Sequence, residues 1–260
     1  LPTPVITASG ATDFCQDDSV VLRGAVSGSG ITYRWLESNT VLGGQTNDSL
    51  VLYSAGSYRV EISDGSCADT SNAVTVTVYD RPSAIITASG PVAFCLGDSV
   101  TLAATPSGAG FSYQWLKDGA ASGNGTDQHQ TSVSGDYRVV VTNSHSCADT
   151  SAITTVVVHP LPVVSLSLSG SSLICQGESV TLDAGAGTGW SYTWKQDNIP
   201  VGGNTATYTA TSTGLYHVTV TDGNNCSDTA SHPVQAYPRP SVTVTPSDTA
   251  FCDGESVLLQ

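Results

Sequence analysis

One nine-residue pattern occurs four times along the chain at almost equal intervals. FCQDDSVVL begins at Phe14 and returns as FCLGDSVTL, ICQGESVTL and FCDGESVLL, so the leading cysteines are Cys15, Cys95, Cys175 and Cys252. Three further motifs follow in fixed order inside each complete interval: a segment ending in Trp, a Gly-x-Tyr-x-Val segment, and a Cys-x-Asp-Thr segment. Self-similarity at a fixed period is the signature of a repeat architecture. The chain therefore contains three complete repeats and the start of a fourth, and we expect it to be a piece of a longer array.

Prolines mark the joints between the repeats. Pro82, Pro162 and Pro240 each follow the last apolar segment of one repeat and precede the first segment of the next. Proline fixes φ and lacks an N–H donor, so it ends a strand and stiffens the connection. The sequence therefore predicts short, stiff linkers.

Within a repeat, apolar and polar residues alternate over short stretches. Ile31, Tyr33 and Trp35 alternate with Thr32 and Arg34, which is the period-2 pattern of a half-buried strand. About seven such strands in about 80 residues, separated by Gly-rich and Ser-rich turns, predict an all-β fold built as an antiparallel β-sandwich.

The order of the motifs resembles the immunoglobulin fold. SVxLxA corresponds to strand B, the Trp segment to strand C, and GxYxV to strand F. The resemblance implies that the core holds Trp35, Trp115 and Trp194, and that tyrosine corners are formed by Tyr58, Tyr137 and Tyr216. One departure is plain, because small or β-branched apolar residues replace the cystine at the centre of that fold. The implied architecture is a head-to-tail rod of tandem immunoglobulin-like sandwiches.

More narrowly, the repeats resemble the immunoglobulin-like repeats of giant cell-surface adhesins of Bacteroidota, including gliding-motility adhesins, in which FCxGDSVTL and GCxDT elements recur. This resemblance covers essentially the whole chain. It implies an extracellular, cell-surface location and a role in cell adhesion. The expected immunoglobulin-like repeats span residues 1–80, 81–160 and 161–239, with a partial repeat of strands A and B only at 240–260.

Seven cysteines in a β-rich chain favour disulfides in an oxidising compartment. Pairing inside repeats would join Cys15 to Cys67. In the immunoglobulin alignment, however, one precedes strand B and the other follows strand F, about 20 Å apart by strand length. A disulfide requires a Cα separation of roughly 4.4–6.8 Å. The alignment therefore favours bonds between neighbouring repeats, although pairing inside repeats and free thiols remain open. The expected bonds are Cys15–Cys147 and Cys95–Cys226, with partners outside the chain for Cys67, Cys175 and Cys252.

Charge and residue types exclude several classes of function. Eight Lys and Arg against 22 Asp and Glu leave no basic face for nucleic acid, and no apolar run is long enough for membrane insertion. None of the five histidines recurs in all three repeats, and no nucleophile elbow or phosphate loop is present. We expect no enzymatic activity and no cofactor.

The cysteines and the acidic turns are candidates for metal binding, and some of the turns also carry a possible glycosylation motif. No CxxC pair supports zinc. Calcium remains an alternative, although aspartate commonly caps turns, and we assign no metal site. The carboxylates considered for it are Asp64, Asp69, Asp222 and Asp228 near the F–G turns, and Asp17 and Asp18 near the A–B corner. Asp-Ser/Thr-x tripeptides resemble the O-glycosylation pattern of Bacteroidota, which would make the chain a glycoprotein. The candidate acceptors are Ser19, Ser49, Thr70, Ser99, Thr150, Thr229 and Thr249.

These observations predict a structural repeat segment of an extracellular bacterial adhesin or surface filament, forming a stiff disulfide-stapled stalk. Its partners would be the neighbouring repeats of the same chain, with surface glycans or other cells contacted through regions outside it. The alternative is a ligand-binding immunoglobulin-like module appended to a secreted enzyme or receptor.

Overall fold

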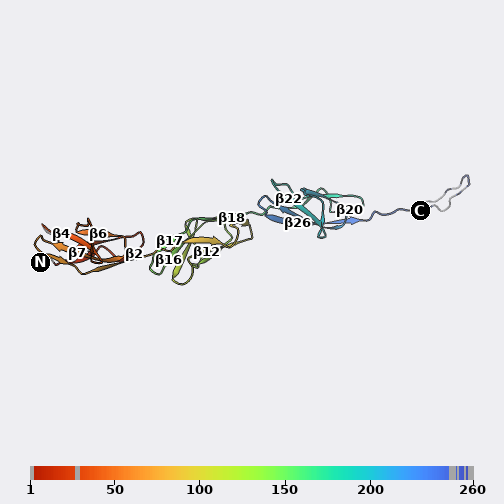
Figure 1. Ribbon diagram of the computed structural model, residues 1–260. Helices are drawn as coiled ribbons and strands as arrows, with labels where there is room; N and C mark the ends of the chain where they lie inside the picture. The colour runs from red at the N-terminus through yellow and green to blue at the C-terminus, as the bar shows by residue number, and fades with distance from the viewer. Residues whose placement is uncertain (1–2, 27–29, 246–249, 251, 255, 257–260) are drawn as a thin grey trace. The chain divides into compact units, whose positions relative to one another are not determined.

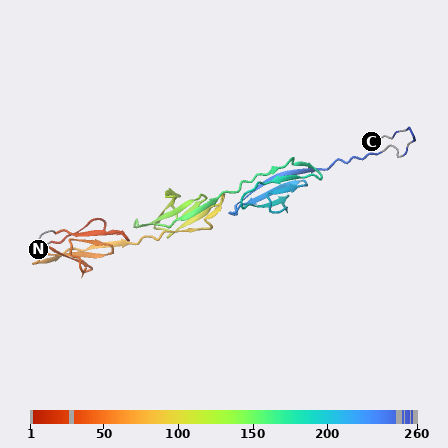
Figure 2. The same cartoon turned by 90° about the horizontal axis from the view of Figure 1, so that it is seen from above.

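The computed structural model describes residues 3–26, 30–245, 250, 252–254 and 256. Every regular element in these residues is a β-strand, so none of them forms a helix that could cross a membrane. Residues 1–93 with 98–157 form one compact unit, and residues 94–97 with 158–260 form another. In two views of the molecule, the strands of each complete repeat gather into a sandwich of their own (Figures 1 and 2).

The first repeat is a sandwich of a three-stranded and a six-stranded sheet. The smaller sheet has the order β1 (Ile6–Ala8), β3 (Val20–Gly24), β6 (Ser49–Leu52). The larger sheet has the order β2 (Asp13–Cys15), β9 (Val74–Tyr79), β7 (Gly56–Ser63), β4 (Thr32–Glu37), β5 (Thr40–Val41), with β8 (Ala68–Thr70) also paired to β7.

The second repeat has the same topology. Its smaller sheet has the order β10 (Ile85–Ala88), β12 (Val100–Thr105), β15 (Gln128–Thr131). Its larger sheet has the order β11 (Ala93–Cys95), β18 (Thr154–His159), β16 (Gly135–Asn143), β13 (Phe111–Lys117), β14 (Ala120–Ser122), with β17 (Ala148–Thr150) paired to β16.

The third repeat differs only in its last strand. Its smaller sheet has the order β19 (Ser167–Leu168), β21 (Val180–Asp183), β24 (Thr207–Ala210). Its larger sheet has the order β20 (Leu173–Cys175), β26 (Ser227–Tyr237), β25 (Gly214–Thr221), β22 (Ser191–Gln196), β23 (Ile199–Val201). Here one long strand, β26, replaces the broken pair of strands that ends the other two repeats.

Each core is built on the residues that the motifs single out. Trp35, Trp115 and Trp194 are at most 1% exposed. The indole N–H of Trp35 donates to the carbonyl of Asn47 at 2.9 Å, and the other two tryptophans make the same bond. This bond satisfies the single polar atom of a side chain that is otherwise in apolar surroundings.

The tyrosine of strand F ties that strand to the preceding turn. The hydroxyl of Tyr137 donates to the carbonyl of Val133 at 3.0 Å. Equivalent bonds join Tyr58 to Ser54 and Tyr216 to Ser212. All three tyrosines are 1% exposed, so the corner is part of the core of each repeat.

A parallel strand pair places the first cysteine of a repeat beside the end of that repeat. In the first repeat, β2 runs parallel to β9 and brings Cys15 opposite Tyr79. In the third repeat, β20 and β26 bring Cys175 opposite Tyr237. Since Tyr79 and Tyr237 are the last strand residues before the linkers, each of these cysteines lies at the linker end of its repeat.

The expected fourth repeat falls largely outside the described residues. Residues 238–245, 250, 252–254 and 256 form no strand, and the remaining residues of 240–260 are not described.

Candidate functional site

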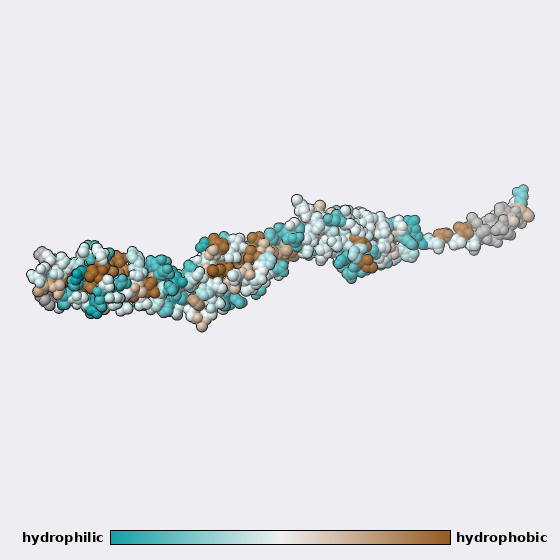
Figure 3. Space-filling view, viewed as in Figure 1, coloured by the Kyte–Doolittle hydropathy of each residue, from teal (hydrophilic) through white to brown (hydrophobic). Residues whose placement is uncertain are grey.

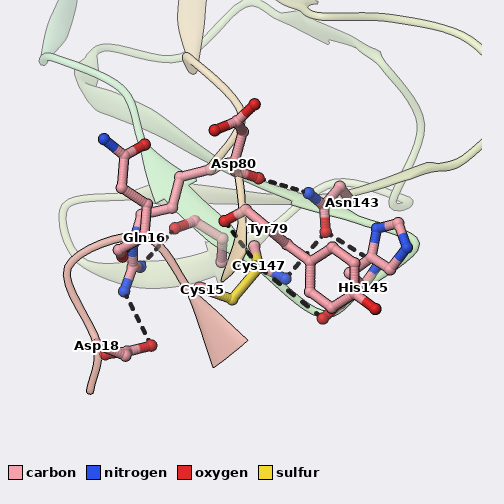
Figure 4. The surroundings of a disulfide bond; sticks show 10 residues. Cys15, Gln16, Asp18, Tyr79, Asp80, Asn143, His145 and Cys147 are labelled. Atoms are coloured by element: carbon pink, nitrogen blue, oxygen red, sulfur yellow. Dashed lines mark hydrogen bonds and ion pairs between the residues drawn. A yellow bond between two sulfur atoms is a disulfide. The ribbon is translucent and has the colours of Figure 1, made fainter. Parts of the chain in front are cut away.

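The two disulfides join neighbouring repeats. Cys15 bonds to Cys147 and Cys95 bonds to Cys226, each with a Cα–Cα distance of 5.5 Å. These are the two inter-repeat pairs that the sequence predicts, and neither joins a repeat to itself. Cys67 and Cys175 carry free, exposed thiols, and Cys252 is exposed. Figure 4 shows the first bond and its surroundings, which we call the first junction.

On the side of the first repeat, the junction is held by the turn that follows β2. The backbone N–H of Gln16 donates to the carbonyl of Tyr79 at 2.8 Å, continuing the parallel pairing by one residue. The N–H of Asp18 donates back to the carbonyl of Cys15 at 3.0 Å, which closes a tight turn with a positive φ of 72° at Asp17. Both bonds fix the backbone on either side of the cysteine.

On the side of the second repeat, the cysteine lies in the turn between strands F and G. The side-chain oxygen of Asn143 accepts the N–H groups of His145 and Cys147, both at 3.0 Å. An Asn side chain that accepts from the following backbone stabilises such a turn without help from a strand. Cys147 is 0% exposed, whereas the thiol of its counterpart Cys67 is exposed.

Arg81, in the linker, contacts both repeats at once. Its Nε–H donates to the carbonyl of Gln16 at 2.8 Å, and its Nη1 donates to the carbonyl of Ala148 at 3.0 Å. Its Nη2 lies 3.4 Å from the carboxylate of Asp18. The planar guanidinium has several donors in a fixed arrangement, so one side chain can serve acceptors on both sides of the joint.

Three more contacts surround the first disulfide. The carboxylate of Asp149 accepts the N–H of Ala84 at 2.9 Å, and the side-chain amide of Asn143 donates to the carbonyl of Asp80 at 2.9 Å. The rings of Tyr79 and His145 stack with their centroids 3.8 Å apart (Figure 4). Hydrogen bonds and ring stacking thus dock the linker on the turn, in addition to the disulfide that joins the two repeats.

This docking is not apparent from the motifs alone, which give Arg81 no role and place Asp149 only in an Asp-Thr glycosylation motif. The sequence does contain a signal for this role. The chain has only eight Lys and Arg residues, and an Arg occupies the same linker position after the first repeat (Arg81) and after the third (Arg239).

The second junction, which surrounds the Cys95–Cys226 bond, has different side chains at the equivalent positions. Leu161 takes the place of Arg81, and Asp222 takes the place of Asn143. Neither side chain can donate a hydrogen bond in its usual ionisation state. Within the described part of residues 158–245, linker residues 160–164 form no hydrogen bond or ion pair with turn residues 222–228. The Cys95–Cys226 bond joins this turn to the second repeat.

The acidic turn residues bind their own backbone. The carboxylate of Asp64 accepts the N–H of Cys67 at 2.8 Å and that of Ser66 at 2.9 Å. These hydrogen bonds hold the pKa of Asp64 below its ordinary value. Asp222 makes the same arrangement with Asn224 and Cys226. Among the described residues, no three His, Cys, Asp or Glu side chains gather to hold a metal ion.

The candidate glycosylation residues are mostly on the surface. Asp69 accepts the N–H of Thr70, and Asp228 accepts the N–H of Thr229, both at 2.8 Å. Ser49 is half-buried on β6, and Thr249 lies outside the described residues. The exposed candidates are Ser19, Thr70, Ser99, Thr150 and Thr229.

Elsewhere the surface offers small apolar areas. On the face shown in Figure 3, apolar residues form separate patches within a mostly hydrophilic surface. A hollow of about 520 Å³ on the second repeat is lined in part by Tyr113, Trp115 and Thr142. Close to it, His129 packs against Trp115 and Tyr137, with centroid distances of 5.4 and 5.6 Å. Burial lowers the pKa of His129.

Comparison with known proteins identifies the fold. No family model matches the chain. It is similar to the highly immunogenic outer capsid protein of Enterobacteria phage T4, with 26% identity over 287 residues covering 96% of this chain and 74% of that protein.

Two solved fragments of titin also resemble the chain. One is a three-immunoglobulin-domain structure of a Glu-to-Ala variant, at 13% identity and TM-score 0.51, and the other is an I-band fragment, at 13% identity and TM-score 0.50. Both alignments cover 92% of this chain and all of the fragment. The chain is therefore a series of tandem immunoglobulin-like domains with two disulfides.

Proposed function

We propose that the chain is a structural repeat segment of an extracellular adhesin or surface filament, in which disulfides between neighbouring repeats make a stiff stalk. The observation that carries the proposal is the bond between Cys15 and Cys147, which joins two separately folded sandwiches at the ends where the linker connects them. A bond inside one repeat would stabilise that repeat, whereas a bond between repeats restricts the angle between them.

The linker adds to this restriction. The joint between the first two repeats is crossed by the backbone, by the disulfide and by the hydrogen bonds of Arg81. Three separate connections restrict bending and twisting more than the backbone alone would. A disulfide that closes a loop of more than 100 residues also contributes about 4–5 kcal/mol in the chain-entropy description.

Several observations support a location outside the cytoplasm. Disulfides persist in oxidising compartments, and the similar phage protein is an outer capsid protein. The net charge of −14 suits a surface that stays solvated. Within this class we propose a cell-surface adhesin of the Bacteroidota type, carrying glycans at the exposed Asp-Thr motifs. The partners of each repeat are its neighbours, and no catalytic role is proposed.

Electron microscopy of single molecules tests the stalk. The angle between adjacent repeats should be narrowly distributed in the oxidised chain and broad in a Cys147→Ser/Cys226→Ser variant. A matched control is Cys67→Ser/Cys175→Ser, which removes two free thiols and should leave the angles unchanged. Equally broad distributions in the oxidised chain and the first variant would show that the bonds do not stiffen the chain.

A further inference from the structure

The linker end of the third repeat carries nearly the same side chains as that of the first. We call these surfaces end faces. The first end face consists of Cys15, Gln16, Asp18, Tyr79 and Arg81. The third consists of Cys175, Gln176, Glu178, Tyr237 and Arg239. The second is different, with Cys95, Leu96, Asp98, His159 and Leu161.

The first and third end faces also share their backbone geometry. The N–H of Gln176 donates to the carbonyl of Tyr237 at 2.7 Å, as Gln16 does to Tyr79 at 2.8 Å. The N–H of Glu178 donates to the carbonyl of Cys175 at 2.9 Å, as Asp18 does to Cys15. The two turns therefore present their cysteines in the same way.

Arg239 already lies over the turn of the third end face. Its Nη2 is 3.9 Å from the position that a Cβ atom on Gly177 would occupy. Arg81 lies over the corresponding turn of the first repeat, where its Nε–H binds the carbonyl of Gln16. The guanidinium of Arg239 thus lies beside the turn of its own repeat, as that of Arg81 does in the first repeat.

The third end face is open, whereas the first is covered. Cys175 has an exposed thiol and Tyr237 is 51% exposed. Beside them is a hollow of about 320 Å³, lined in part by Gln176, Tyr237 and Pro238. On the first face the partner turn covers the equivalent surface.

We propose that the third end face binds a turn with the chemistry of residues 143–149, in preference to one with the chemistry of residues 222–228. Such a turn has an Asn four residues before its cysteine, a ring two residues before it, and an Asp two residues after it. This inference rests on the proposed stalk, because it names the kind of repeat that docks there.

Each feature of that turn has a counterpart on the third end face. Arg239 offers donors to the carbonyl that follows the cysteine, as Arg81 does for Ala148. Tyr237 offers a ring to the imidazole, as Tyr79 does for His145. In the sequence, Pro238 corresponds to Asp80, whose carbonyl accepts the amide of Asn143. Val242 corresponds to Ala84, whose N–H binds Asp149.

The covalent step is a thiol–disulfide exchange. The Cys175 thiolate attacks the cysteine sulfur of a turn that carries a mixed disulfide with thionitrobenzoate. The S–S bond to Cys175 forms, the original S–S bond breaks, and thionitrobenzoate leaves as a coloured thiolate. No net oxidant is consumed, and the release of colour reports the rate.

The test uses the full chain with Cys67→Ser and Cys252→Ser, which keeps Cys175 as the attacking thiol. Two activated peptides are compared, one with residues 142–150 (TNSHSCADT) and one with residues 221–229 (TDGNNCSDT). The first should react about tenfold faster, because its Asn amide and its imidazole each make a contact that the second peptide cannot make. Mass mapping should place the peptide on Cys175.

Four control variants separate recognition from general reactivity. Asn143→Asp in the first peptide gives it the formal charge of the second and should remove most of its advantage. Arg239→Leu in the chain, which copies Leu161, should slow the reaction with both peptides, because the carbonyl that Arg239 binds follows the cysteine in each, and Arg239→Lys should restore only part of the rate. A chain with Cys175→Ser and Cys252→Ser, which presents Cys67, should react with both peptides at similar rates.

Equal rates at Cys175, a faster second peptide, or rates with both peptides that Arg239→Leu leaves unchanged would each overturn the inference. None of these results bears on whether the existing disulfides stiffen the chain, which the angle measurement decides separately. A preference at Cys175 together with broad angles in the oxidised chain would instead support the recognition and contradict the stalk.

Discussion

Arg81 illustrates how one side chain can define a joint. Its side chain is 36% exposed, so its ion pair with Asp18 is weak. Its bonds to two backbone carbonyls, one on each repeat, oppose bending of the joint, because the two acceptors move relative to one another when the joint bends. A lysine at this position would bring a point charge without the fixed fork of donors.

We expect Arg81→Leu to weaken the docking of the first two repeats by about 1–2 kcal/mol, the net value of its hydrogen bonds. The Cys15–Cys147 bond reports this loss, because docking holds the two sulfur atoms together. In a glutathione redox buffer its equilibrium constant should fall about 5-fold to 30-fold.

Arg23→Leu, on the exposed face of β3, is the matched control and should leave that equilibrium unchanged. The Cys95–Cys226 bond provides an internal reference in the same molecule, because Leu161 stands at its linker. An equal change in both bonds would contradict the role assigned to Arg81.

At the scale of elements, strand β15 carries a polar residue, His129, at a position where the equivalent strands of the other repeats carry Leu50 and Tyr208. His129 pairs with Leu102, as Leu50 pairs with Leu22 and Tyr208 with Leu182. The imidazole packs on Trp115 and Tyr137, and burial lowers its pKa. The folded second repeat therefore favours the neutral ring.

This arrangement predicts a loss of stability in acid. The unfolded chain binds a proton at the ordinary histidine pKa of about 6.5, whereas the folded repeat binds it only at lower pH. Stability is thus retained above pH 6.5 and is lost as the pH falls below it, until the folded ring also titrates. Hydrogen exchange at pH 7.5 and 5.5, corrected for the intrinsic exchange rate at each pH, should show lower protection of the second repeat at the lower pH than of the other two repeats.

The control for this prediction is His129→Leu, which copies Leu50 of the first repeat. It should remove the component of the acid effect that is specific to the second repeat. The first and third repeats, which have Leu50 and Tyr208 at this register, serve as references in the same experiment. An acid effect that persists in full in the variant would show that other groups cause it.

The elements also show what the sequence could reveal. The alternation around Trp35 indicates a strand, and the recurring Tyr58 motif indicates a corner. Both can be recognised because every repeat needs the same buried residues at the same positions. Strand β2 could not be found this way, since three residues are too short for a period. Its parallel pairing with β9 is a tertiary effect, and so is the docking of Arg81, which depends on where two turns meet.

At the scale of the whole molecule, the two disulfides overlap along the sequence. The loop closed by Cys15–Cys147 contains Cys95, and the loop closed by Cys95–Cys226 contains Cys147. Three chain segments, residues 15–95, 95–147 and 147–226, therefore each connect one disulfide to the other. The shortest of them, between Cys95 and Cys147, limits how far the others can extend when repeats unfold.

This connectivity predicts a short maximum extension under force. Pulled from both ends in an atomic force microscope, the fully unfolded reduced chain should reach about 900 Å, at about 3.5 Å per residue. The oxidised chain should stop near about 350 Å, because only about 100 residues lie on the shortest covalent path.

A variant that removes one bond decides between this connectivity and pairing inside repeats, since three bonds within repeats would stop the intact chain at nearly the same length. In Cys95→Ser/Cys226→Ser, the remaining Cys15–Cys147 bond should allow about 450 Å. If Cys15 were instead bonded to Cys67, the same variant would extend to about 730 Å. The shorter value would mean that tension passes from repeat to repeat through sulfur even after a sandwich has unfolded, so that a stalk of this design keeps its length when single repeats fail.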